Sequence, residues 1–220
     1  MKRIMHYFIL GLMCMLLIAC NRSHIKGDGK IVSQNRAINT FSELNIIGNF
    51  VITMNADQTA SNVEVKTDEN IQPYITTETS GGTLTLVVKK GFRIEPTAPV
   101  QVVINNKGLN KVTLNGKNII TVTGLSGDAF TLNMKGSGAA VLKGTEKSTY
   151  FGIEGSALIN SASLNSETVK VKIIGDGKLI VNATKKLEVY INGSGQVTYF
   201  GQPPIVNREI YGSGKLLQGD

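Results

Sequence analysis

Apolar residues recur at every second position on both sides of a series of regularly spaced glycines. The glycines stand 18 to 20 residues apart, at Gly116, Gly136, Gly155, Gly175, Gly193 and Gly212. The positions two and four before each glycine, and four and six after it, are apolar in almost every repeat, whereas the residues between them are mostly polar. Alternation with period two and one apolar face predicts half-buried strands. Each repeat is therefore predicted to be a strand, a glycine corner, a second strand and a polar return.

A single repeat of this kind cannot bury its own apolar face, whereas stacked repeats can. Stacking equivalent strands in register gives parallel pairing about 4.8 Å apart, with like side chains in ladders inside. The pattern predicts an all-β fold, a parallel β-helix or β-solenoid with turns of about nineteen residues. Glycine suits such corners because it permits positive φ and avoids a Cβ clash between turns. The recurring Gly-Ser-Gly words leave a second interpretation open, a row of nucleophiles or an anion-binding nest.

The N-terminal third is less regular. Residues 41–54 carry the same pattern around Gly48, which predicts an early turn of the solenoid. Residues 62–71 and 75–90 predict longer strands with a Ser80-Gly81-Gly82 turn, and residues 91–99 predict a loop. This section is either a blunt cap or a small antiparallel layer. At the other end Arg208 and Gln218 replace apolar residues, which predicts a terminal turn with a polar outer side.

The first twenty residues predict export. Lys2 and Arg3 precede an apolar run, residues 8–19, that is too short for a comfortable membrane span. The run ends in Leu17-Ile18-Ala19-Cys20, which resembles the lipobox of bacterial lipoproteins and implies cleavage before Cys20 and lipid on its thiol. An ordinary signal peptide and an uncleaved anchor are the alternatives. Asn21 favours the outer membrane of a Gram-negative envelope. We therefore expect a signal peptide (1–19), a lipidated tether with a first strand (20–40) and one solenoid domain (41–220).

Few residues that support chemistry are present. Cys14 and Cys20 are the only cysteines, and His6 and His24 the only histidines, so no disulfide, histidine triad or histidine-rich metal site is expected in the mature fold. No nucleotide-binding loop precedes a helix, and no cofactor or metal is predicted. Glu154 and Asp176 flank neighbouring corners; they are either a solvated edge or the acid/base couple of a carbohydrate-active enzyme. We expect no catalytic residues.

Charge and aromatic residues suggest a binding surface. The formal charge of +7 is dispersed, which favours either solubility or a preference for anionic polysaccharide or lipid headgroups, and no basic run suggests nucleic acid. Tyr150, Tyr190 and Tyr211 fall in the outward phase of the later repeats, where they could stack on sugars or proteins or simply cover the surface. Together with Lys170 and Lys172 they are the predicted binding residues.

Three features carry a resemblance to a known family: the ending "INGSGQVTYFGQPPIVNREIYGSGKL", the recurring Gly-Ser-Gly and the opening "NRAINTFSELNIIGNFVITM". From about Gly27 to the C-terminus the chain resembles the bacterial putative auto-transporter adhesin, head GIN domain, family. The resemblance implies an exported and often lipid-anchored protein, a right-handed parallel β-helix and no catalytic residues to transfer.

The sequence therefore predicts a non-enzymatic, lipid-anchored cell-envelope protein, an adhesin or binding module that uses one solenoid face. Its expected partners are the membrane, through the lipid, and a glycan or an envelope protein. One alternative is a β-helix enzyme acting on acidic polysaccharide. Another is a structural envelope component without a soluble ligand.

Overall fold

The structure is a computed structural model that describes residues 23–219, and these residues form an all-β fold, as predicted. The predicted signal peptide and the predicted lipidation site, Cys20, lie outside the described residues. The strands are β1 (Ser23–Lys26), β2 (Ile31–Ala37), β3 (Glu43–Ile47), β4 (Val51–Asn55), β5 (Asp57–Asp68), β6 (Ile75–Ser80), β7 (Thr83–Val88), β8 (Phe92–Glu95), β9 (Gln101–Lys107), β10 (Lys111–Gly175), β11 (Lys178–Gly193), β12 (Gln196–Phe200), β13 (Ile205–Gly212) and β14 (Lys215–Gln218). A single 3-10 turn, η1 (Gln72–Tyr74), interrupts them. No helix in this part of the chain is long and apolar enough to cross a membrane.

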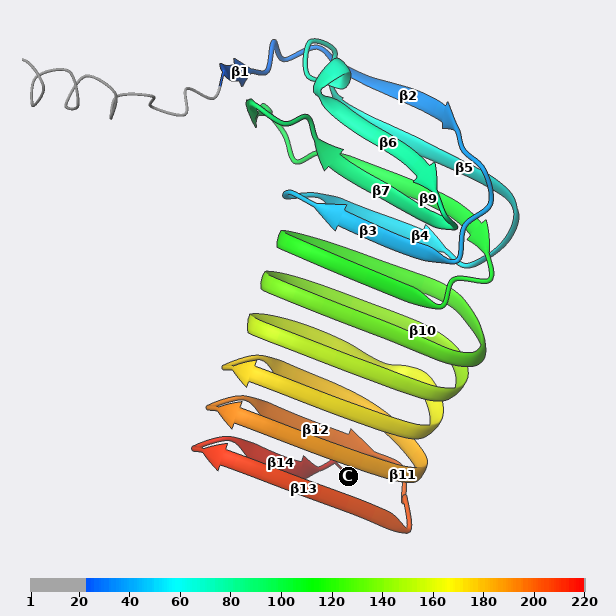
Figure 1. The fold of residues 1–220 in the computed structure, drawn as a ribbon, viewed down its shortest axis with the longest axis vertical. Helices are drawn as coiled ribbons and strands as arrows, with labels where there is room; N and C mark the ends of the chain where they lie inside the picture. The colour runs from blue at the N-terminus through cyan, green and yellow to red at the C-terminus, as the bar shows by residue number, and fades with distance from the viewer. Residues whose placement is uncertain (1–22, 220) are drawn as a thin grey trace, which may run out of the picture.

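Successive turns of the chain lie one above another along the long axis of the molecule (Figure 1). The long β10 bends through several of these turns, and β11 to β14 continue the stack. Pairing from β10 onward is parallel: Val171 lies opposite Val189, and Gly175 lies opposite Gly193. The next pair along the stack places Gly193 opposite Gly212. Corner glycines that are consecutive in the sequence pattern are therefore neighbours in the sheet.

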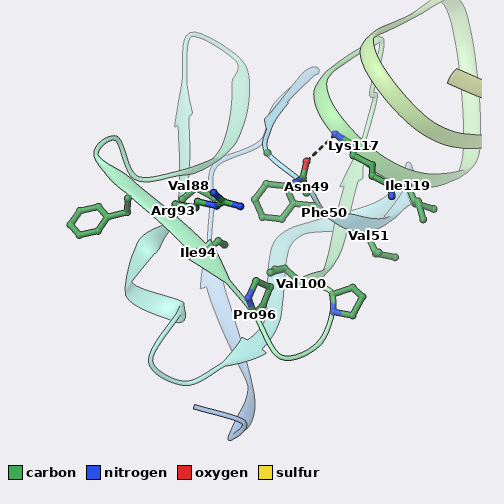
Figure 2. A pocket seen from close by; sticks show the side chains of 13 residues that line it. Asn49, Phe50, Val51, Val88, Arg93, Ile94, Pro96, Val100, Lys117 and Ile119 are labelled. Atoms are coloured by element: carbon green, nitrogen blue, oxygen red, sulfur yellow. Dashed lines mark hydrogen bonds between the residues drawn. The ribbon is translucent and has the colours of Figure 1, made fainter. Parts of the chain in front are cut away.

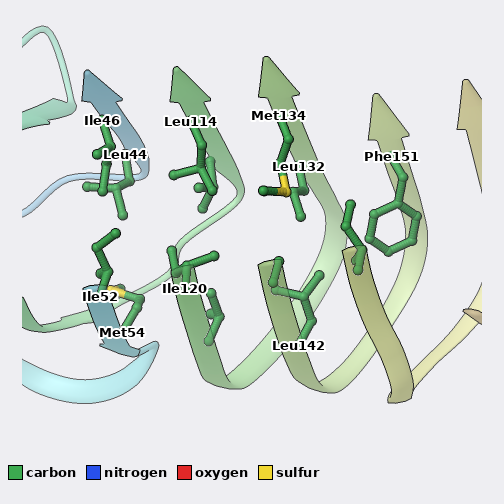
Figure 3. Close-up of a cluster of buried hydrophobic side chains, with 14 of the residues drawn as sticks. Leu44, Ile46, Ile52, Met54, Leu114, Ile120, Leu132, Met134, Leu142 and Phe151 are labelled. Carbon is green, nitrogen blue, oxygen red and sulfur yellow. The ribbon is translucent and has the colours of Figure 1, made fainter. Parts of the chain in front are cut away.

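The interior consists of the apolar columns that the sequence pattern singles out. Figure 3 shows Leu114, Leu132 and Met134 facing Ile120 and Leu142 across the space between the two strands of each turn. All of these side chains are buried, and they belong to one continuous hydrophobic cluster that runs from Phe41 to Val197. The apolar positions predicted around Gly48 are also confirmed, because all four of these residues are buried: Leu44, Ile46, Ile52 and Met54. Burial of these ladders is the main source of stability for residues 23–219, which contain no cysteine and therefore no disulfide.

Backbone contact between turns explains the corner glycines. Gly175 has a φ of 121°, and a Cβ built on it would lie 2.7 Å from the carbonyl oxygen of Gly155 in the previous turn. The same relation recurs along the column, since a Cβ on Gly193 would meet the carbonyl oxygen of Gly175. The residues between the glycines are exposed, among them Ser156, Asp176 and Ser194. The corner glycines therefore have a structural role, because a side chain there would push two turns apart.

The N-terminal section is both a cap and a small antiparallel layer, the two arrangements that the sequence leaves open. It is an antiparallel layer, because β2 pairs with β5, β5 with β9, and β6 with β7, and this layer closes the upper end of the stack (Figure 1). Two expectations need correction. Residues 92–95 form β8 rather than a loop, because Ser23 to Lys26 pair with them in parallel. The described part of the predicted tether, residues 23–40, contains two strands, β1 and β2, where the sequence predicts a tether and one strand.

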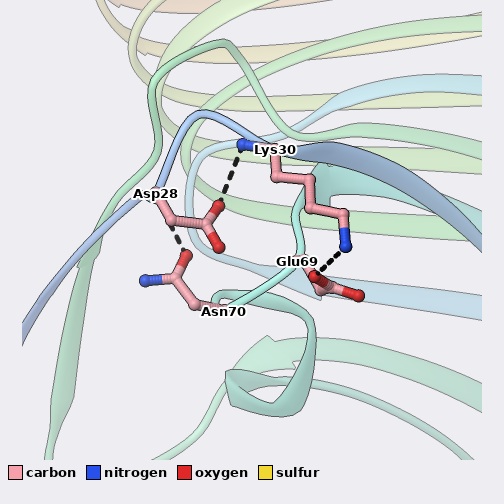
Figure 4. A network of polar contacts seen from close by, with 4 residues as sticks. All are labelled: Asp28, Lys30, Glu69 and Asn70. Atoms are coloured by element: carbon pink, nitrogen blue, oxygen red, sulfur yellow. Dashed lines mark hydrogen bonds and ion pairs between the residues drawn. The ribbon is translucent and has the colours of Figure 1, made fainter.

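Polar contacts tie this N-terminal layer together. In Figure 4 the amide of Asp28 donates to Asn70 (3.1 Å), the amide of Lys30 donates to the Asp28 carboxylate (3.0 Å), and the Lys30 ammonium pairs with Glu69 (2.7 Å). The exposed ion pair contributes little by itself, because water screens it. The network nevertheless fixes the β1–β2 connection against the end of β5.

Among residues 23–219 two carboxyl groups are buried, those of Asp68 and Glu146, and their surroundings shift their pKa values in opposite directions. Burial alone would raise the pKa of Asp68, but hydrogen bonds from the hydroxyl (2.6 Å) and amide (2.9 Å) of Thr97 and from the amide of Gly29 (2.8 Å) outweigh it and hold the pKa below its ordinary value. Burial, with the nearby charge of Asp128, raises the pKa of Glu146 to about 7. One carboxylate oxygen of Glu146 is buried without a hydrogen-bond partner. Asp68 therefore stabilises the fold as an anion, whereas Glu146 is tolerated best in its neutral form.

The last turn differs from the others, as predicted. Arg208 and Gln218 are exposed, and Gln218 accepts a hydrogen bond from the Tyr199 hydroxyl (3.2 Å). Among the described residues, β13 pairs only with β11, and β14 only with β12. Polar side chains thus replace the apolar ladder at the lower end of the stack.

Candidate functional site

The structure brings the five predicted binding residues onto one outward face near the C-terminal end of the stack. Tyr150, Lys170, Lys172 and Tyr190 line a single hollow of about 990 Å³. Lys172 lies directly opposite Tyr190 in the parallel pairing of β10 with β11. The fifth residue, Tyr211, borders the hollow: its ring centroid is 5.7 Å from that of Tyr190, and 58% of the residue is exposed. We call these five residues the tyrosine–lysine face.

Local packing explains how the aromatic rings are presented. Alternation along each strand turns the valines at 171 and 189 into the core and the residues beside them outward. Gly152 provides room beside Tyr150, since a Cβ there would lie 3.2 Å from the ring. Tyr150 and Tyr190 are half-buried, so each exposes part of its ring and remains fixed by the strand beneath it. The rings therefore form a largely preorganised surface.

The charges around the hollow are mixed, with a small excess of positive groups. Glu188 forms ion pairs with Lys186 (2.6 Å) and Lys170 (3.7 Å). The hydrogen bond from Lys186 is the chief reason that the pKa of Glu188 lies below its ordinary value. Lys172 holds its ammonium 6.0 Å from the centroid of the Tyr190 ring, within reach of a cation–π contact. Arg208 and Glu209 complete the charged lining. Three cations, Lys170, Lys172 and Arg208, face two carboxylates in the lining, and this small positive excess is compatible with a ligand that carries negative groups.

The arrangement offers stacking surfaces and cations. Of the acidic pair considered for catalysis, Glu154 forms an ion pair with Lys135 (3.2 Å) and Asp176 is exposed. His24, at the other end of the molecule, pairs with Glu95 (2.8 Å). Within residues 23–219, no three His, Cys, Asp or Glu side chains are grouped in a way that could hold a metal ion.

Sequence reasoning missed part of the lining. Glu188 joins the hollow because it lies opposite Lys170, and Glu209 because it lies opposite Tyr190. Arg208 lies opposite Val189, the neighbour of Tyr190. The period of the repeat carries this signal: residues one period away from Lys170 and Lys172 occupy the same face. A second hollow, near Phe50 and Arg93, is lined partly by residues 91–99, for which the sequence pattern predicts only a loop.

Comparison with solved structures supports the fold. A putative adhesin from Bacteroides fragilis NCTC 9343 superposes with a TM-score of 0.71 at 18% identity, over 89% of this chain and 100% of that chain. A putative lipid binding protein from Parabacteroides distasonis ATCC 8503 gives a TM-score of 0.56 at 23% identity, over 90% of this chain and 100% of that one. A putative adhesin from the same strain gives 0.50 at 22% identity, with the same two coverages. At these identities the likeness establishes a shared fold.

Sequence comparison establishes the family. A search of the curated proteins finds no match to this chain. The model of one family, however, matches residues 40–203, which span most of the turns described above. The chain therefore belongs to the putative auto-transporter adhesin, head GIN domain, family.

Proposed function

We propose that the protein is a non-enzymatic, adhesin-type binding module of the bacterial cell envelope, and that the tyrosine–lysine face is its binding surface. The observation that carries the proposal is that the predicted binding residues lie together in the structure. Four residues chosen from the repeat pattern alone line one hollow, and the ring of the fifth lies beside it. Membership of an adhesin-like family is consistent with a surface or envelope location.

An acidic glycan is the ligand that this surface fits best. Tyr190 and Tyr211 lie on the paired strands β11 and β13, so their rings can stack on successive sugar rings of an extended chain. Lys172 and Arg208 flank these rings and provide positive charge for carboxylate or sulfate groups. A carbohydrate-active enzyme, the alternative considered above, has no supporting observation among the described residues.

The finer features of the fold and its location belong to the same proposal. We infer that the turns coil as a right-handed parallel β-solenoid of about nineteen residues per turn, which the register of β10 to β14 supports. We also infer cleavage after residue 19 and lipid attachment at Cys20 in the outer membrane. A lipid anchor at the N-terminus would leave the opposite, C-terminal end of the stack, with its tyrosine–lysine face, accessible to ligands.

A glycan screen tests the proposed surface. The chain beginning at Asn21 is applied to immobilised acidic and neutral glycans, with Tyr190→Ala, Tyr211→Ala and Lys172→Ala compared with the wild type. Lys143→Ala is the matched control, because Lys143 is also an exposed lysine of β10 and does not line the hollow. We expect binding to acidic glycans that the three variants weaken and the control retains. Selective capture of envelope proteins with no glycan bound would contradict the choice of ligand.

A further inference from the structure

A second hollow, of about 520 Å³, lies at the N-terminal end of the stack. This volume is within the range of small-ligand sites, about 300–1,000 Å³. One side of the hollow is formed by β8 and the segment that follows it, and the other side by the corner that precedes β4 (Figure 2). Its apolar lining includes Phe50, Val51, Val88, Ile94, Pro96 and Val100. Phe50 forms the base, since it is buried and its ring fills the space that a side chain at Gly48 would need.

Three separate contacts fix the outer wall of this hollow. The strand β8 pairs in parallel with β1, so that Ser23 lies opposite Phe92. The ring of Phe92 packs against Tyr74, with 4.6 Å between centroids. Beyond β8, the buried carboxylate of Asp68 accepts hydrogen bonds from the amide and hydroxyl of Thr97. The wall is therefore built into the fold and is not a loose loop.

The charged groups at the hollow are all positive. Arg93 extends toward the ring of Phe50, and Lys117 lies at the opposite edge, where its backbone amide donates to Asn49 (2.9 Å) (Figure 2). No acidic residue lines the hollow, and within residues 23–219 neither cation forms a salt bridge. An apolar space with two cations at its rim is complementary to an apolar chain that ends in a negative group.

We propose that this hollow binds one acyl chain of an anionic amphiphile, a fatty acid or a single-chain phospholipid. The chain packs over Phe50 among Val51, Val88 and Ile94, and the carboxylate or phosphate is held by Arg93 and Lys117. This site is separate from the tyrosine–lysine face, because the two hollows share no lining residue. Acyl-chain binding and glycan binding are consequently independent activities of the same molecule.

Competition between amphiphiles tests the ligand class. The chain beginning at Asn21 is titrated with a fluorescent sixteen-carbon fatty acid, which is then displaced by unlabelled palmitate, hexadecanol and hexadecyltrimethylammonium. We expect saturable binding, displacement by palmitate, and at least tenfold weaker displacement by the neutral and cationic competitors. Saturated fatty acids of eight to twelve carbons should bind more tightly by about tenfold for each two methylenes added. Failure of the probe to saturate, or equal displacement by all three head groups, would overturn the proposal.

Variants at exposed positions locate the site without threatening the fold. Ile119, which is 48% exposed, lines the hollow, and Ile119→Asp should weaken fatty-acid binding at least tenfold. Leu158→Asp is the matched control, an equally exposed residue of β10 outside the hollow, and should bind like the wild type. Arg93→Gln with Lys117→Gln should weaken palmitate and leave hexadecanol unchanged. Tyr190→Ala should keep full fatty-acid binding, so a failure of the glycan proposal is distinguishable from a failure here. Equal affinities for Ile119→Asp and Leu158→Asp would exclude this hollow as the site.

Discussion

Replacing Gly175 by alanine tests whether the corners are held together by backbone contact between turns. Gly175 has positive φ, and an added Cβ would lie 2.7 Å from a backbone oxygen of the neighbouring turn, which no side-chain motion can relieve. Gly81 is the matched control, because it also has positive φ but a Cβ there would have nothing within 4 Å. Both substitutions incur backbone strain, whereas only Gly175→Ala forces the turns apart.

Backbone strain and overpacking between turns together give the expected difference in the free energy of unfolding between the two variants. A side chain in the left-handed region, where Gly81 has a φ of 56°, costs about 1–2 kcal/mol, which we expect for Gly81→Ala. At Gly175, whose φ of 121° lies beyond that region, backbone strain costs about 1–3 kcal/mol. Overpacking of the tight contact adds about 1–3 kcal/mol, so Gly175→Ala should lose about 2–6 kcal/mol in total. A third variant, Gly195→Ala, isolates packing, since Gly195 lacks positive φ and its Cβ would lie 2.7 Å from the Ile173 side chain.

Chemical denaturation measures these losses. Urea unfolding of the chain beginning at Asn21, followed by circular dichroism, gives the free energy of unfolding when the transitions are two-state and the slopes agree between variants. The reasoning predicts that Gly175→Ala is destabilised more than Gly81→Ala. Equal losses for these two variants would refute the claim that corner glycines are required by contact between turns.

Three further stability predictions follow from buried groups. Leu132→Ala should lower the free energy of unfolding by about 2–5 kcal/mol, measured by urea denaturation, whereas Leu158→Ala should change it little because Leu158 is 52% exposed. Glu146→Gln should raise stability at pH 8: the pKa of Glu146 is raised to about 7 in the folded state, so the wild type loses stability as pH rises from about 4.5 to 7 and the variant should not. Thermal melts of both proteins across this interval would show a parallel pH dependence if the argument were wrong. Asp68→Asn should lower stability by about 1–3 kcal/mol at pH 7, because the buried donors of Thr97 lose a charged acceptor. The folded-state pKa of Asp68 lies below its ordinary value, so the difference should shrink as pH falls below about 4 and through this lowered pKa, where the folded wild-type carboxyl becomes protonated. A gap that stays constant down to pH 2 would contradict this role.

The repetitive part of the fold was predictable from the sequence because every turn repeats the same local rules. Val171, Val189 and their equivalents alternate with polar residues, and glycine recurs where two turns meet, so one period fixes both burial and register. The tyrosine–lysine face followed from the same period, because outward positions one period apart must share a face. Non-repeating segments lack this redundancy.

The N-terminal layer depends on contacts between residues far apart in the chain. Phe92 to Glu95 form a strand only because β1, about seventy residues earlier, pairs with them, and no local pattern encodes that partner. Asp68 could not be recognised as buried, since the donors that satisfy it come from Gly29 and Thr97. The hollow over Phe50 depends on both features, and it was therefore not visible in the sequence.

Calorimetric titration is the most direct test of the tyrosine–lysine face as the binding surface. The acidic glycan selected by the screen is titrated into the wild type, into a variant carrying Tyr190→Ala and Tyr211→Ala, and into Lys143→Ala. The account predicts at least a tenfold loss of affinity for the double variant and wild-type affinity for Lys143→Ala. Unchanged affinity in the double variant, with its fold intact by circular dichroism, would contradict it.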